Sequence, residues 1–125
     1  ALIPLVIDIT NPTPRFGWRG IERTSFTDRV KPSFATWLAV LHHLCLGLGI
    51  PLAEVMALIF EISRDAVVEF VAPEDPMARH ISATRQSELA PYSGELFEEL
   101  ANSLGTIKSK LAVSETRTMY HLVRA

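Results

Sequence analysis

Residues 33–44 read SFATWLAVLHHL, and this stretch decides how the chain is expected to fold. An apolar run at 34–41 has the composition of a strand and delivers two adjacent histidines to the point where a buried strand should end. In open α/β sheets, ligands bind beyond the carboxyl ends of the strands. Gly47, Gly49 and Pro51 follow, ahead of an apolar helix. This order predicts a strand-to-helix turn that faces a ligand.

The sequence on either side of this stretch alternates between strand and helix patterns. The expected elements are a strand at 2–9, a long loop at 15–32, a strand at 34–41 with a helical continuation as the alternative, a helix from Leu52 through Phe60, a strand at 66–71, a helix at 77–84, a helix from Ser93 to 104, and two strands at 106–113 and 116–123. The last two strands lie close enough in sequence to form a hairpin. The pattern predicts one α/β domain over residues 1–125, with a mostly parallel sheet and a C-terminal antiparallel hairpin.

Composition limits the classes of function. The 125 residues include 12 basic and 14 acidic side chains, giving a net charge of −2, and the basic residues are scattered. No basic footprint for nucleic acid is therefore present. The single cysteine, Cys45, lies in an apolar segment and is expected to be a core residue of a protein in a reducing compartment. No apolar run approaches the length of about 18 residues that a membrane span needs, and no signal-peptide pattern opens the chain, so we expect a cytoplasmic location and no membrane partner.

Four groups of residues occur in an order that resembles a known family. They are Asp8-Ile-Thr-Asn-Pro-Thr-Pro14 with Gly17-Trp-Arg19 and Glu22-Arg-Thr-Ser25; Leu38–Leu44 continuing to Ile50-Pro-Leu52; Glu69-Phe-Val71 with Glu74, Asp75, Arg85 and Tyr92; and Arg117-Thr-Met-Tyr120. Together they resemble the C-terminal half of class I S-adenosylmethionine-dependent methyltransferases, and more narrowly the nodulation-protein-type family.

The resemblance implies a partial Rossmann-like sheet and a function in methyl transfer from S-adenosylmethionine to an acceptor that the sequence does not identify. The family's glycine-rich cofactor turn and the acidic residue that holds the ribose have no counterpart here, and the chain opens directly in a strand pattern. We therefore expect that an upstream part has been removed, and that the chain alone is inactive and binds the cofactor weakly or not at all. Ser33 stands where the family usually has Asp.

His42 and His43 are the predicted catalytic candidates, because the resemblance places the end of the fourth strand near the sulfonium and the acceptor. One imidazole would act as a general base toward a hydroxyl or amine, since histidine titrates near neutral pH. Lining of the pocket without proton transfer, and a role in the core, remain open as alternatives. Adjacent residues on a strand point to opposite faces, so only one is expected to face the pocket. No metal site is predicted, because further ligands at useful spacing are missing.

Asp8 is the predicted cofactor-binding residue, since by resemblance its carboxylate accepts a hydrogen bond from the adenine amino group. The alternative is an Asx-turn that leads into the following Asn-Pro. Trp18, Arg19 and Arg23 are predicted to bind a planar or anionic acceptor. The alternative for this loop is an internal pair between Glu22 and an arginine, with Trp18 as an anchor over the core.

Glu69 is the most unusual carboxylate, because it interrupts an apolar strand and buried glutamate is rare unless paired. It is predicted either to face the acceptor or to pair with Arg85 or Arg117. A second hypothesis for the whole chain is a non-catalytic α/β module that self-associates into a homo-oligomer through unpaired strand edges. A histidine-dependent hydrolase is disfavoured, because no Gly-x-Ser-x-Gly motif is present.

Overall fold

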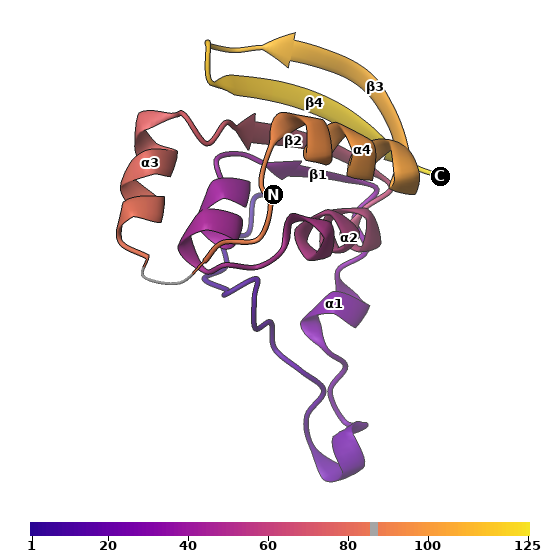
Figure 1. Ribbon diagram of the computed structural model, residues 1–125. Coiled ribbons are helices and arrows are strands. Elements are labelled where there is room, and N and C mark those ends of the chain that lie inside the picture. The colour runs from indigo at the N-terminus through magenta and orange to yellow at the C-terminus, as the bar shows by residue number, and fades with distance from the viewer. Residues whose placement is uncertain (86–87) are drawn as a thin grey trace. The chain divides into compact units, whose positions relative to one another are not determined.

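The computed structural model describes residues 1–85 and 88–125, which divide into two compact units, Ala1–Lys31 and Pro32–Ala125 (Figure 1). The elements in chain order are η1 (Trp18–Gly20), α1 (Phe26–Arg29), β1 (Phe34–Trp37), η2 (His43–Gly47), α2 (Leu52–Ile62), β2 (Asp65–Val71), α3 (Pro76–Ala83), α4 (Gly94–Leu104), β3 (Gly105–Ala112) and β4 (Arg117–Arg124). The first unit holds η1 and α1, and the second holds everything else.

The first unit has little regular structure. The strand predicted at 2–9 is wrong, because residues 1–8 form no helix or strand and the side chain of Leu2 is 95% exposed. An extended apolar segment becomes a strand only when its backbone groups pair with a neighbour, and within the described ranges none pairs with this one. The long loop predicted at 15–32 contains two short helices and an isolated antiparallel bridge between Phe16 and Arg23.

The second unit contains a four-stranded mixed sheet in the order β1-β2-β4-β3. The β1 and β2 strands are parallel, with Trp37 opposite Val68, whereas β4 runs antiparallel to both of its neighbours. The sheet is therefore α/β and mostly antiparallel, which corrects the expectation of a mostly parallel sheet. The cause is local, because only β1 and β2 are joined by a crossover, through α2, that makes neighbouring strands parallel. The predicted C-terminal hairpin is confirmed, and it adds two strands that run in opposite directions.

The helices of the second unit follow the predicted patterns closely. Ser93 begins α4 by accepting a hydrogen bond from the backbone N–H of Leu96, and Gly105 directly follows the last helical residue. Asp75 begins α3 in the same way, accepting from the N–H of Met77, with Pro76 in the first turn. Such caps satisfy N–H groups that have no partner inside the helix. The predicted bounds of α2, α3 and α4 are confirmed to within a residue or two.

The core lies between the sheet and the helices α2 and α4, which pack against each other beside it (Figure 1). Phe97 of α4 is completely buried, with its ring centroid 5.1 Å from that of Phe70 and 4.7 Å from that of Tyr120. Val68 and Leu122 are also fully buried. The burial of β2 along most of its length explains why its sequence is almost continuously apolar.

The strand predicted at 34–41 ends earlier than expected. β1 stops at Trp37, and Ala39 adopts a left-handed conformation with φ 55°. A residue in that region cannot continue an extended strand, and it is costly for any residue with a Cβ. The chain then turns into helical structure from Leu41, so His42 and His43 lie on a helical turn instead of on the strand. The prediction that they end the strand is therefore wrong.

We predict that Gly105→Ala destabilises the second unit by about 1–3 kcal/mol, the usual cost of overpacking. A Cβ at this position would overlap the carbonyl oxygen of Val123 and the ring of Phe60, at the point where α4 passes into β3. The free energy of unfolding in urea measures the effect. Gly94→Ala is the matched control, because its Cβ would meet Phe70 at an ordinary 3.7 Å. Equal stability of the two variants would contradict the prediction.

Candidate functional site

Polar side chains gather beyond the carboxyl ends of the parallel strands β1 and β2, although the surroundings are apolar. Glu69 lies near the end of β2, Asp75 in the loop that follows it, and Arg117 at the start of β4. His42 lies in the turn that follows β1 and is 1% exposed. This is the position at which α/β sheets bind ligands, and we refer to these four residues as the strand-end cluster.

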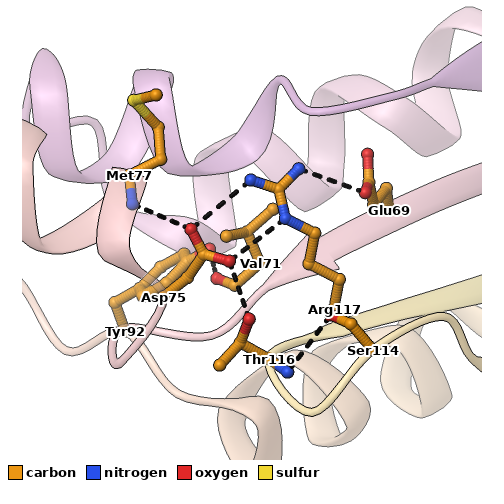
Figure 2. Close-up of polar contacts among 8 residues, drawn as sticks. All are labelled: Glu69, Val71, Asp75, Met77, Tyr92, Ser114, Thr116 and Arg117. Atoms are coloured by element: carbon orange, nitrogen blue, oxygen red, sulfur yellow. Dashed lines mark hydrogen bonds and ion pairs between the residues drawn. The ribbon is translucent and has the colours of Figure 1, made fainter.

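The centre of the strand-end cluster is an ion pair between Asp75 and Arg117. Arg117 Nε donates to Asp75 Oδ2 at 3.1 Å and Nη2 approaches Oδ1 at 3.4 Å. The hydroxyl of Thr116 donates to Asp75 Oδ2 at 2.7 Å, and the N–H of Met77 donates to Oδ1 at 2.9 Å. Figure 2 shows the guanidinium of Arg117 between Asp75 and Glu69. The carboxylate of Asp75, in a residue only 3% exposed, thus has partners for both of its oxygens.

This network fixes the charge states of its members. Hydrogen bonds from Arg117 and Thr116 hold the pKa of Asp75 far below its ordinary value, against the opposing effect of burial. The pKa of Arg117 is raised, chiefly by its hydrogen bonds to Asp75. Asp75 is therefore ionised throughout the physiological range. Sequence reasoning missed its role, although a helix cap followed by proline at 75–76 was a usable signal.

Glu69 is 9% exposed and its Oε1 lies 3.5 Å from Arg117 Nη1. Of the two predicted partners, the structure pairs it with Arg117. Arg85 instead donates to the backbone oxygen of Gly47 at 2.9 Å, and its guanidinium occupies the space where a Cβ on Gly49 would lie. The glycine turn that was predicted to face a ligand is therefore packed by Arg85.

His42 and His43 have opposite environments. His43 is exposed, whereas His42 is buried and its Nδ1 has no hydrogen-bond partner among the residues that the structure describes. Burial lowers the pKa of His42, with smaller contributions in the same direction from His43 and Arg117 and opposing ones from Asp75 and Glu69. The ring of His42 is therefore neutral at neutral pH. Being adjacent on a helical turn, the two rings lie with centroids 4.3 Å apart.

Trp37, at the end of β1, is a second buried group without a partner, and sequence reasoning missed it. It is 6% exposed and its indole Nε1 finds no acceptor in the described part of the chain. A buried polar group left unpaired costs about 1–3 kcal/mol. Two such nitrogens, from Trp37 and His42, lie at one end of the same strand.

Asp8 is exposed and forms the Asx-turn that was the alternative to a cofactor role. Its Oδ1 accepts hydrogen bonds from the backbone N–H of Thr10 at 2.9 Å and from the hydroxyl of Thr10 at 2.7 Å. The N–H of Asn11 donates to the carbonyl oxygen of Asp8 at 3.1 Å. The bonds from Thr10 lower the pKa of Asp8. Binding of adenine by this carboxylate stays a prediction.

Trp18, Arg19 and Arg23 lie in the first unit, separately from the strand-end cluster. Trp18 is 74% exposed, and Arg19 is held in the left-handed region with φ 58°. Arg23 is fixed by the bridge to Phe16. The alternative was an internal ion pair between Glu22 and an arginine. The first unit does not form that pair; its ion pair joins Arg15 to Asp28 at 2.9 Å.

The described residues show neither a membrane-spanning helix nor a metal site. No helix over 1–85 and 88–125 combines the length and apolar character that a membrane span requires. Within the same ranges, no group of three or more His, Cys, Asp or Glu side chains is arranged to hold a metal ion.

The chain is 32% identical over 124 residues to the nodulation protein NoeA of Rhizobium meliloti (strain 1021), a match that covers 98% of this chain and 26% of NoeA. The chain thus spans about a quarter of the length of the curated relative that it matches. No family model and no solved structure matches it. The similarity supports a relationship to nodulation-type proteins.

We predict that Arg117→Met destabilises the second unit by about 2–4 kcal/mol, because it leaves the carboxylate of Asp75 buried without its cation. The double variant Asp75→Asn/Arg117→Met should recover part of this loss. Because the pKa of Asp75 is lowered on folding, its contribution to stability is present at neutral pH and lost as the pH falls below about 4. Urea unfolding between pH 3 and 7 measures both effects.

The matched control is Arg15→Met, which breaks an ion pair whose side chains are 62% and 39% exposed. Exposed pairs contribute at most about 1 kcal/mol. The prediction fails if the loss of stability in Arg117→Met is no larger than in this control, or if it does not depend on pH in the acid range.

Proposed function

We propose that this chain forms the acceptor side of a methyltransferase domain in a longer protein, which transfers a methyl group from S-adenosylmethionine to an acceptor not yet identified. The observation that carries the proposal is the imidazole of His42, beyond the carboxyl end of β1, which is buried, held neutral and has no partner at Nδ1 among the described residues. A group in this state accepts a proton or hydrogen bond from a molecule bound beside it.

The topology of the sheet supports the proposal. The last strand, β4, lies between β2 and β3 and runs antiparallel to both, although it comes last in the chain. Its first residues, Arg117 to Tyr120, are the ones that resemble the final strand of the methyltransferase family. The order of the motifs, from Asp8 to Tyr120, points in the same direction.

The residues of this chain do not by themselves fit the cofactor. The one residue assigned to it, Asp8, is exposed and its Oδ1 is already engaged by Thr10. The glycine-rich turn that the resemblance calls for is not part of these 125 residues. We therefore assign cofactor binding to other parts of the longer protein, and assign to this chain only the surroundings of the acceptor.

The strand-end cluster would act on the acceptor through His42. The ion pair of Asp75 and Arg117 holds the loop after β2 against the start of β4, while burial keeps the imidazole unprotonated. A neutral imidazole is the form that takes a proton from a hydroxyl or amine as it becomes a nucleophile. Trp37, with its free indole N–H, would donate a hydrogen bond to an oxygen of the acceptor.

The test is a titration of the full-length product of the source gene with S-adenosylhomocysteine, followed by transfer of labelled methyl groups into an extract of the source organism. We expect micromolar binding, and transfer about 10²-fold slower in His42→Gln, a typical loss for a general base. Because the pKa of His42 is lowered, transfer should fall only at a pH below about 6.5. His80→Gln, an exposed histidine on α3, is the matched control and should transfer normally.

Affinity for S-adenosylhomocysteine should be unchanged in His42→Gln, because the histidine is assigned to the acceptor. A well-folded full-length protein that does not bind S-adenosylhomocysteine would overturn the proposed activity. Normal transfer by His42→Gln would leave the activity in place and remove the histidine from it.

A second candidate function, self-association, is favoured by one observation: β1 is an edge strand of the described sheet. An unpaired edge offers backbone groups to another chain, and a lysine placed there blocks such pairing. We expect the 125-residue chain to be a dimer in light scattering at tens of micromolar, and Thr36→Lys on β1 to make it monomeric. Thr84→Lys, at an exposed position directly after α3 and on no strand, is the control and should leave the dimer intact, and a monomeric wild-type chain would refute this candidate.

A further inference from the structure

The first unit contains a hollow of about 440 Å³ that is formed by its own residues. Volumes of this size are typical of sites for small molecules. Phe16, Arg23, Arg29 and Thr24 are among the residues that line it. Its lining therefore combines an aromatic ring, two guanidinium groups, one carboxylate and two hydroxyls, brought together from both sides of a tight loop.

The backbone explains why these side chains meet. Phe16 and Arg23 form an antiparallel bridge, with N–H to oxygen distances of 3.1 and 3.0 Å in the two directions. Residues opposite each other in such a pair have their side chains on the same face. The N–H of Phe26 also donates to the oxygen of Thr13 at 2.9 Å, which closes the loop at its base. The helix α1 then adds Arg29 to the hollow.

Gly17 makes room for the remaining charged group. Its φ is 89°, and a Cβ at this position would overlap the side chain of Glu22, which also lines the hollow. The charged groups facing the hollow are thus Arg23, Arg29 and Glu22, with a net charge of +1. A ligand carrying a single negative charge balances them.

The two arginines of the hollow lack the partner that their neighbour has. Arg15 is paired with Asp28, Nη2 to Oδ2 at 2.9 Å. Neither Arg23 nor Arg29 forms an ion pair or side-chain hydrogen bond within the described residues. Guanidinium groups that are not bonded to a carboxylate bind carboxylate, sulfate or phosphate groups by paired N–H donors.

We propose that this hollow binds a small, singly charged anion with a flat apolar body, its charged group on Arg23 and Arg29 and its ring on Phe16. Of the three residues predicted to bind an acceptor in this loop, only Arg23 lines the hollow, and Trp18 and Arg19 do not. The proposal does not depend on methyl transfer.

The test is a calorimetric titration of the full 125-residue chain with sodium benzoate, benzyl alcohol and inorganic sulfate. We expect saturable binding of benzoate and at least tenfold weaker binding of the other two, because each lacks either the charge or the ring. Arg23→Gln and Arg29→Gln should each weaken benzoate at least tenfold, and Phe16→Ala should remove the preference for benzoate over sulfate. Lys31→Gln removes a basic charge outside the hollow and should change the affinity less than twofold.

Three outcomes would overturn the proposal. They are the absence of saturable benzoate binding, equal affinity for benzyl alcohol, and a loss in Lys31→Gln as large as in Arg23→Gln. The far-ultraviolet circular dichroism of each variant reports its folding. If Arg23→Gln unfolds the loop, two other variants provide the test. One is Arg29→Gln, and the other is Arg23→Lys, which keeps the charge but loses the paired N–H donors.

Discussion

The ion pair between Asp75 and Arg117 is the constraint on which the second unit depends. Asp75 begins α3 through its bond to the N–H of Met77 and, with its other oxygen, binds Thr116 and Arg117 at the start of β4. One carboxylate therefore sets both where a helix begins and where the final strand enters the sheet. In a residue only 3% exposed, that carboxylate is tolerable only because it is fully paired.

The same pair shapes the electrostatics of the proposed acceptor site. Arg117 disfavours a positive charge on His42, while Asp75 and Glu69 favour it. These contributions largely oppose one another, so burial decides the outcome and the imidazole is neutral. The cluster can thus be structural and still serve chemistry, because exclusion of water is the largest cause of the lowered pKa of His42. Without Arg117, the two carboxylates would raise the pKa of His42 relative to its present value.

The sequence predicts the elements of the second unit better than their arrangement. The helices α2 and α4 and the strand β2 carry local signals, namely apolar spacing, a serine cap and a continuous apolar run. The absence of a strand at 2–9 and the early end of β1 have causes outside the apolar pattern. The first depends on whether a partner strand is present, and the second on the left-handed Ala39, which no composition rule would choose. Glu69 could be singled out because charge in an apolar strand is unusual, whereas Trp37 could not, because a tryptophan there looks like ordinary core.

The distribution of charge shows why the arginine hollow is hidden from composition. The whole chain has a net charge of −2, which argues against a site for anions. Residues 1–31, however, hold five basic and three acidic side chains, and residues 32–125 hold seven and eleven. Two of those five basic groups, Arg23 and Arg29, face one hollow, whereas Arg15 is neutralised by Asp28. Recognition of an anion needs only two unpaired guanidinium groups at the right separation, because the field that they produce is local and screened within about 8 Å at physiological ionic strength. The net charge of the whole chain therefore does not decide whether the hollow binds an anion.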